Sequence, residues 1–221
     1  MAIGQVLMYP VKFVTGLASF GGAVFGVIRE ETPAYDVLKR VAAEGSGLAF
    51  EVRRYAAFQT IETDMDDGDN GFMRLAGYIG VIGDAQNDAG EKISMTTPVL
   101  SNLRPDDAAK PETRMAFSLP SSVTKAPRPN DSRIKTATRP PSTWAVHRFR
   151  GSWDREHAMA AAEKLRAQLR SKEMAMDEGA DYEWLRYNPP FTLPFLRTNE
   201  IAIKLADDAV PAPPAAEANQ A

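Results

Sequence analysis

The residues that could carry chemistry in this 221-residue chain are few. Cysteine is absent, which excludes disulfides, zinc ribbons, thiol catalysis and thiolate ligation of iron. The two histidines, His147 and His157, fall on different predicted elements, so the chain has no paired-histidine metal motif. The sequence also lacks a G-x-S-x-G nucleophile elbow, a P-loop and a G-x-G-x-x-G dinucleotide motif. This inventory favours a protein that binds a ligand over one that catalyses a reaction.

His147 is the side chain that the pattern offers as a metal ligand. On the predicted strand 143–151, Ala145, His147 and Phe149 point to one face of the sheet. The imidazole would then stand on an apolar wall, from which it could bind a haem iron. The alternative is a histidine that is hydrogen-bonded within the sheet and binds no metal. The sequence leaves both interpretations open.

Hydrophobic periodicity defines the elements that would position such side chains. In the first half of the chain, alternating apolar residues predict strands, and an i, i+3, i+4, i+7 pattern predicts a helix. Phe72, Leu75, Ala76 and Ile79 form the apolar stripe of this helix. The predicted elements of the first half are strands 48–55 and 57–63, helix 69–79, and strands 94–100 and 113–119.

The second half repeats this order, and Ser152 or Asp154 can cap its helix. The predicted elements are strands 133–138 and 143–151, helix 154–171, and strands 182–187 and 199–205. The proline-containing stretches 101–112, 120–132 and 188–198 are predicted loops. The sequence thus predicts an α+β fold. A duplicated strand–strand–helix–strand–strand unit forms a curled, mostly antiparallel, barrel-like sheet with two main helices.

The overall charge argues against nucleic-acid binding. The chain carries 26 basic and 29 acidic residues, a formal net charge of −3, and so has no basic excess. A hydrophobic content of 44% is enough for one domain with a sizeable core. We place this domain at residues 31–205. Residues 206–221 are rich in Ala and Pro, and we expect them to form a disordered tail.

The N-terminal segment 1–28 differs from the rest in composition. Residues 11–28 are mostly apolar and hold one charge, Lys12. The length of this segment is close to the lower limit for a helix that crosses a bilayer. A membrane anchor, a segment packed on its own domain or on a partner, and a cleaved signal peptide all remain open. The lack of a basic stretch before Tyr9 favours an anchor over a cleaved signal. We expect a membrane-associated or soluble protein and assign no compartment.

Several segments, in their order along the chain, resemble the SOUL haem-binding protein family. The resemblance covers nearly all of residues 31–205. The combination of KISMTTPV with YNPPF and RTNE is its most specific part. The matching segments are ETPAYDVL (31–38), FEVRRY (50–55), GFMRLAGYI (71–79), EKISMTTPV (91–99), MAFSLP (115–120), RFRG (148–151) and YNPPFTLPFLRTNEIAIKL (187–205).

The resemblance implies non-enzymatic binding of haem or a related tetrapyrrole, without covalent attachment, in an apolar groove beside the first helix. Such a protein would serve in buffering, transport or membrane-side handling of the ligand. Burial of the porphyrin disc gains about 25 cal/mol per Å² of apolar area, and its propionates need cationic partners. The candidate disc contacts are Phe72, Leu75, Ala76, Ile79, Tyr187 and Phe191. The candidate propionate partners are Arg54, Arg74 and Arg197.

Two positions depart from the family pattern. Some relatives carry a histidine where this chain has Arg54, and some carry a proposed propionate-binding lysine where it has Gly77. Two further functions also remain open. One is an enzyme acting on a bound tetrapyrrole, such as in haem breakdown, with His147 as the proximal ligand. The other is an interaction module anchored to a membrane through residues 11–28.

Overall fold

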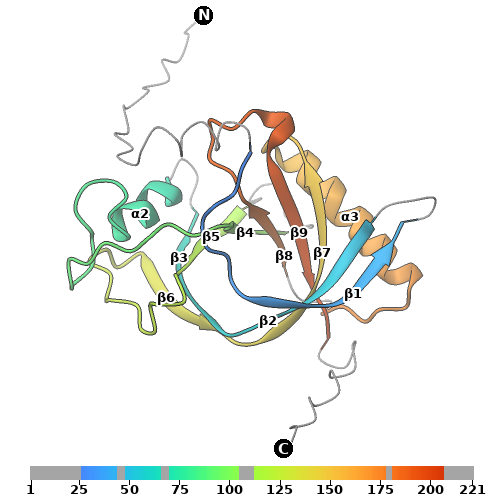
Figure 1. Ribbon diagram of the computed structural model, residues 1–221, viewed down its shortest axis with the longest axis horizontal. Helices are drawn as coiled ribbons and strands as arrows, with labels where there is room; N and C mark the ends of the chain where they lie inside the picture. Colours follow the sequence, from blue (N-terminus) through green and yellow to red (C-terminus); the bar gives the residue numbers. More distant parts are fainter. Residues whose placement is uncertain (1–25, 44–47, 66–69, 105–111, 178–180, 207–221) are drawn as a thin grey trace, which may run out of the picture.

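The fold is a single curled sheet with both helices on one of its faces (Figure 1). It is seen in a computed structural model that describes residues 26–43, 48–65, 70–104, 112–177 and 181–206. Most of the N-terminal segment 1–28 and nearly all of the predicted tail 206–221 lie outside the described residues. In the part of the chain that is described, no helix is long and apolar enough to cross a bilayer.

The sheet has nine strands, and every neighbouring pair is antiparallel. Their order is β1-β2-β7-β9-β8-β4-β5-β3-β6. The bounds are β1 (Tyr35–Ala42), β2 (Leu48–Tyr55), β3 (Phe58–Asp64), β4 (Val99–Leu103), β5 (Glu112–Ser118), β6 (Ile134–Arg139), β7 (Ser142–Arg150), β8 (Tyr182–Arg186) and β9 (Thr198–Lys204). The predicted α+β fold with a curled antiparallel sheet is confirmed.

The duplication is visible in the strand order. Outwards from the central β4–β8 pair, the order is β5, β3, β6 on one side and β9, β7, β2 on the other. The two halves therefore exchange their first strands, because β6 of the second half pairs with β3 and β2 of the first half pairs with β7. This exchange ties both halves into one continuous sheet.

Two parts of the sheet differ from the sequence prediction. Strand β1 was not predicted, and it extends the sheet by pairing with β2. Its pairing shifts between Val37 and Lys39 and again between Val41 and Ala42, so the residues do not show a regular alternation. The strand predicted at 94–100 begins only at Val99 and continues to Leu103, inside the predicted loop 101–112.

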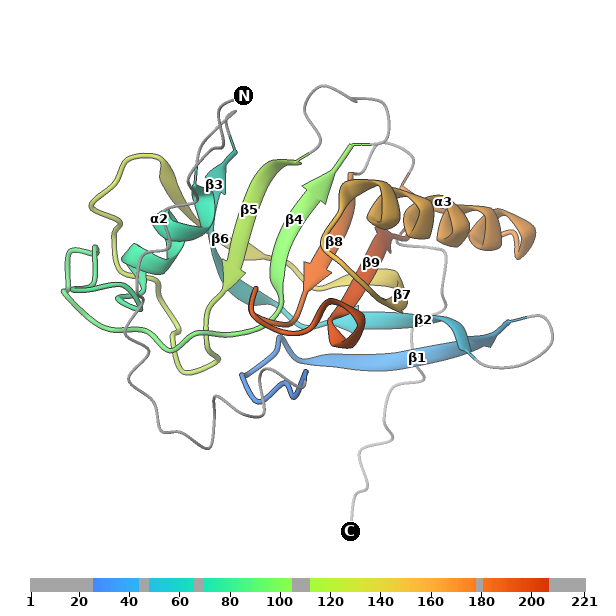
Figure 2. The same ribbon diagram turned by 90° about the horizontal axis from the view of Figure 1, so that it is seen from above.

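The two helices cover the same face of the sheet (Figure 2). Helix α2 (Gly71–Tyr78) is capped at its N-terminus by Asn70, whose side chain accepts a hydrogen bond from the Met73 amide at 3.1 Å. It packs on β3 and β5 through a cluster that includes Leu75 and Phe117. Helix α3 (Arg155–Ser171) is capped by Asp154 and packs on β7 and β9, with Leu165 fully buried.

The opposite face of the sheet is the inside of the curl. Its apolar cluster consists of Tyr55, Leu100, Ala116, Val146, Leu185, Tyr187 and Ala202. The edge strand β6 curls back over the middle of the sheet there, since Arg139 on β6 reaches Glu183 on the central strand β8 with an Nη1–Oε1 distance of 2.6 Å. The molecule therefore offers two different surfaces for a ligand, one beside α2 and one inside the curl.

Candidate functional site

An open groove of about 620 Å³ runs along α2. The helix lines it with one stripe, Asn70, Met73, Arg74 and Gly77, at the i, i+3, i+4, i+7 spacing of a single helix face. The facing wall is made by Gln86, Asn130, Asp131, Arg133 and Ile134. Its size lies within the range of small-molecule sites, which is about 300–1,000 Å³.

Three charged side chains define the electrostatics of this groove. Asp131 accepts hydrogen bonds from Arg133 at 3.0 Å (Nε–Oδ1) and 2.7 Å (Nη2–Oδ2) and lies 3.7 Å from Nε of Arg74. Arg133 in the first place, with Arg74 contributing, lowers the pKa of Asp131 to about 2, so this carboxyl is ionised at neutral pH. Arg74 also donates to the Thr63 hydroxyl and to the Asp64 carbonyl. Two cations thus share one carboxylate, which leaves the groove net positive.

The predicted disc contacts on α2 mostly face away from the groove. Leu75, Ala76 and Ile79 are 0%, 1% and 2% exposed, because they join the helix to the sheet. None of the three lines the groove. Phe72 is 36% exposed, and its ring packs edge-on against that of Phe117, with 5.4 Å between the ring centres.

Sequence analysis missed the apolar groove residue Met73, which is 37% exposed. The stripe of Asn70, Met73, Arg74 and Gly77 lies next to the apolar stripe on the helix surface and has the same spacing. The signal that could have identified Met73 is a large apolar residue within an otherwise polar stripe. Of the predicted site residues, only Arg74 lines this groove.

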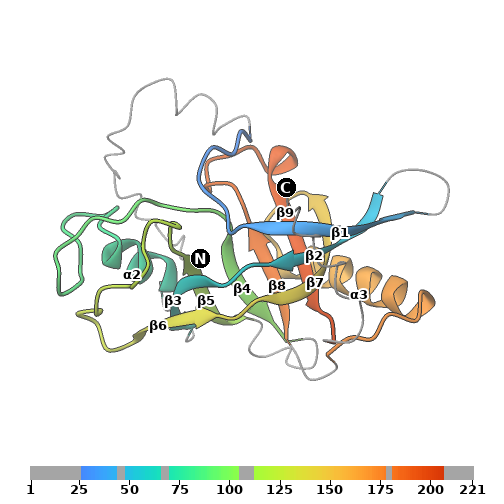
Figure 3. The ribbon, with the colours of Figure 1, turned by 60° about the horizontal axis from the view of Figure 1, so that its bottom comes forward.

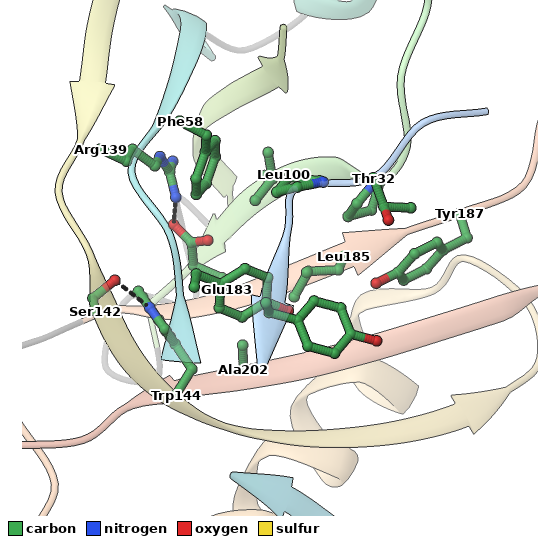
Figure 4. Close-up of a pocket in the computed structure, with 14 residues that line it drawn as sticks. Thr32, Phe58, Leu100, Arg139, Ser142, Trp144, Glu183, Leu185, Tyr187 and Ala202 are labelled. Atoms are coloured by element: carbon green, nitrogen blue, oxygen red, sulfur yellow. Dashed lines mark hydrogen bonds and ion pairs between the residues drawn. The ribbon is translucent and has the colours of Figure 1, made fainter. Parts of the chain in front are cut away.

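Tyr187 belongs to the second hollow, inside the curl (Figure 4). This hollow is aromatic but narrow, with a volume of about 40 Å³. That volume is enough for about three waters. Trp144 donates to the Ser142 hydroxyl at 2.8 Å along its wall. The lining residues are Thr32, Pro33, Tyr35, Tyr55, Phe58, Pro98, Leu100, Arg139, Ser142, Trp144, Glu183, Leu185, Tyr187 and Ala202.

A buried ionic cluster lies behind this hollow, and sequence analysis did not single it out. The Tyr187 hydroxyl donates to Glu200 at 2.7 Å, and Arg53 donates two hydrogen bonds to the same carboxylate. Burial is the main cause of a raised pKa for Tyr187, and the negative charge of Glu200 adds to it. The phenol is therefore neutral at physiological pH and is already engaged as a donor. The sequence signal was a glutamate in the alternating stretch NEIAIKL, on the face opposite Ile201 and Ile203.

The other predicted residues lie elsewhere. Arg54 is half-buried on β2, and its Nε donates to the Thr143 hydroxyl at 3.4 Å. Phe191 and Arg197 belong to the loop 188–197. There the Arg197 guanidinium lies 4.7 Å from the ring centre of Trp153. The predicted binding residues therefore fall in separate parts of the molecule.

His147 lines neither hollow. It lies on β7 between Ala145 and Phe149, on the face that carries α3. Its Nδ1 is 2.5 Å from the carbonyl oxygen of Ala49, and its ring stacks on Phe149 at 6.4 Å between centres. The described residues contain no group of three or more His, Asp or Glu side chains that could hold a metal ion.

Comparison with known proteins identifies the family. Residues 30–204 match the family described as SOUL heme-binding protein. The chain belongs to this family. A comparison with curated proteins found no match.

Solved structures with a similar chain path are distant in sequence. A hydrolase from Listeria innocua is 10% identical with a TM-score of 0.48, and the match covers 72% of this chain and 92% of the hydrolase. The C-terminal domain of EcmrR is 11% identical with a TM-score of 0.46, and the match covers 70% of this chain and 95% of that domain.

Proposed function

We propose that this SOUL-family chain binds haem or a related tetrapyrrole in the groove beside α2, without catalysing a reaction on it. One observation carries the proposal: the groove combines an apolar side chain, Met73, with the cationic pair Arg74 and Arg133. A porphyrin needs both, because its disc is apolar and its two propionates are anionic. The chemistry of the groove suits this ligand, and the family supports it.

The residues present favour binding through the disc and the propionates rather than through the iron. None of the described residues that line the groove is a histidine, and its only sulfur ligand is the thioether of Met73. We therefore expect haemin and iron-free protoporphyrin IX to bind with affinities within about threefold of each other, a free-energy difference of about 0.6 kcal/mol. A much stronger affinity for haemin would point to an iron ligand and would contradict this view. A tetrapyrrole held without a histidine ligand to its iron suits buffering, transport or transfer at a membrane.

The direct test is a haemin titration of the full-length protein, followed by the Soret band and by tryptophan quenching. Met73→Asp puts a charge into the groove and is expected to weaken binding by at least about tenfold. Phe195→Asp is the matched control, because Phe195 is exposed in the loop 188–197 and does not line the groove. A flat titration of the wild type rejects haem binding. Equal binding by the wild type and Met73→Asp rejects this groove as the site.

The enzymatic alternative depends on His147. Haem breakdown needs an open iron face and activation of oxygen, and His147 was the proposed proximal ligand. Its imidazole lies on the α3 side of the sheet, within hydrogen-bonding distance of the Ala49 carbonyl. We expect His147→Ala to leave the haemin spectrum unchanged. A variant that lost the Soret band while remaining folded would favour the enzyme.

A further inference from the structure

Of the six large hydrophobic side chains that are exposed among the described residues, four gather at one edge of the molecule, and the other two, Phe72 and Met73, lie on α2. Phe195 is 67% exposed, and Val27, Leu193 and Phe191 are 47%, 38% and 37% exposed. Three of them belong to the loop 188–197, which contains a short 3-10 helix, η1 (Pro194–Leu196). We name these four side chains the apolar edge. Contiguous exposed hydrophobic side chains are uncommon on soluble monomers and mark interaction surfaces.

Backbone geometry brings the two parts of the apolar edge together. Gly26 has a φ of +81°, and a Cβ atom there would lie 2.8 Å from the carbonyl oxygen of Leu196. Only glycine permits this close approach. Figure 3 shows the start of the described chain beside the loop that contains η1. Val27, the next residue along the chain, therefore lies close to the loop 188–197.

The loop holds its hydrophobic side chains outward by its own hydrogen bonds. The amide of Thr192 donates to the Pro189 carbonyl at 3.1 Å, and that of Leu196 to the Leu193 carbonyl at 2.8 Å. The Arg197 side chain braces the loop by donating to the Thr192 carbonyl at 2.9 Å. These hydrogen bonds fix the backbone of the loop while its hydrophobic side chains stay exposed. The side chains can therefore contact an apolar surface without a change in the loop.

The composition of the segment that precedes Val27 indicates what the apolar edge contacts. The chain reaches Val27 directly from residues 11–25, which are mostly apolar and hold one charge, Lys12. The first charge beyond them, Arg29, is followed at once by Glu30 and Glu31, so attraction to anionic groups is not the main force here. A lipid surface accepts both the apolar segment and the apolar edge.

We propose that the apolar edge docks on a lipid bilayer, with Phe195, Leu193, Phe191 and Val27 entering the boundary between headgroups and acyl chains. The arginines at this edge stay at the headgroup level: Arg150 donates to the Leu196 carbonyl at 3.2 Å, and Arg197 lies against Trp153. The docking extends beyond tetrapyrrole binding and does not rest on it. It would keep the groove beside α2, on a different part of the fold, open while the protein is bound.

The absence of cysteine makes a site-specific test available. Phe195→Cys in the full-length chain is labelled with a nitrobenzoxadiazole dye and mixed with phosphatidylcholine vesicles. We expect a blue shift and an increase in fluorescence of at least about twofold as the dye leaves water. Met73→Cys, at an exposed position on α2, is the control and should not change.

Three outcomes would overturn the proposal. If the chain binds the vesicles but the fluorescence of the dye at position 195 does not change, other residues make the membrane contact. A dye that is already shielded without vesicles would mean that the N-terminal segment or a second copy covers the edge. Equal responses at both positions would show unspecific adsorption.

Vesicle flotation gives an independent measurement. Leu193→Ser combined with Phe195→Ser is expected to lower the vesicle affinity of the full-length chain by at least about tenfold, because two large apolar side chains are removed from the contact. Met73→Ser, which removes one exposed apolar side chain from α2, is the control for a loss outside the apolar edge. The expected tenfold loss corresponds to about 1.4 kcal/mol. If the double variant binds vesicles within about twofold of the wild type, the apolar edge is rejected as the docking surface.

Discussion

Arg53 and Glu200 form a buried ion pair with two hydrogen bonds, at 2.8 Å (Nη1–Oε2) and 3.0 Å (Nη2–Oε1). Their side chains are 3% and 0% exposed. Arg148 and Tyr187 add further hydrogen bonds to the same carboxylate, at 2.8 and 2.7 Å. The pair connects β2 with β9 across the intervening strand β7, so it locks together strands from the two halves of the duplication.

Removal of the charge of Glu200 should destabilise the fold strongly. Glu200→Gln keeps the size of the side chain but leaves the buried Arg53 guanidinium with Glu51, 2.8 Å from its Nε, as its remaining counter-charge. Breaking a buried ion pair costs up to about 3–5 kcal/mol. Urea unfolding measures the difference. Asp64→Asn is the control, because its partner Lys135 and Asp64 itself are both largely exposed, and such pairs contribute about 0–1 kcal/mol. Equal losses in the two variants would refute this role of the pair.

The Glu200 carboxylate should also make the free energy of unfolding depend on pH in the acid range. Burial alone would raise the pKa of Glu200, but the hydrogen bonds and charge of Arg53, with Tyr187 and Arg148, outweigh it and hold the pKa below its ordinary value. The folded state therefore binds this proton less readily than the unfolded state. The stabilisation is fully present above the pKa of an unfolded glutamate, about 4.3, and is lost as the pH falls through the folded value. Urea midpoints between pH 3 and 7 should fall steeply on the acid side for the wild type and less steeply for Glu200→Gln.

The sequence was most informative where periodicity was regular. Both helices and most strands follow from the spacing of their apolar residues, since a face that packs on the core repeats with the period of its element. Strand β1 did not show this pattern, because it lies at the edge of the sheet and its pairing with β2 is interrupted twice.

The site was less predictable than the fold, for a physical reason. An apolar stripe such as Leu75 and Ile79 has the same signature whether it contacts a ligand or the sheet, and here it packs on the sheet. The pairing of Arg53 with Glu200 spans 147 positions, so no local pattern reports it. Arg74, which lines the groove, could be named from the sequence because it is a cation on the helix that the family resemblance places beside the ligand. Its neighbour Met73 was not named, since it stands among polar residues.

Asp131 should limit the affinity of the groove for anionic porphyrins. Its carboxylate occupies Arg133 and lies near Arg74, so a propionate must compete with it. Asp131→Asn removes the competing charge, and we expect haemin to bind about two- to fivefold more tightly, the scale of a partly exposed charge pair. Added salt should reduce the gain. Asp36→Asn, exposed on β1, is the control. Unchanged affinity in Asp131→Asn would mean that the propionates bind elsewhere.

Gly77 leaves room for a third cation in the groove, beside Arg74 and Arg133. A Cβ atom at this position would meet only Cγ of Gln86, at 3.8 Å, which is ordinary contact. Gly77→Lys should therefore fit on the helix and bring an ammonium group to the groove, at the position where some SOUL relatives carry lysine. A charge-assisted hydrogen bond to a propionate should raise haemin affinity by about tenfold. Replacing glycine inside a helix should also stabilise the fold by about 0.5–1 kcal/mol.

Two controls separate charge from helix propensity at Gly77. Gly77→Met gives a similar gain in stability but adds no charge, so it should not gain the affinity that lysine gives. Protoporphyrin IX dimethyl ester lacks free carboxylates, and its binding to Gly77→Lys should match its binding to the wild type. Haemin titrations and thermal unfolding of the three proteins provide both measurements. If lysine improves binding of the ester as much as that of haemin, the gain comes from packing, and the groove beside α2 does not recognise the propionates.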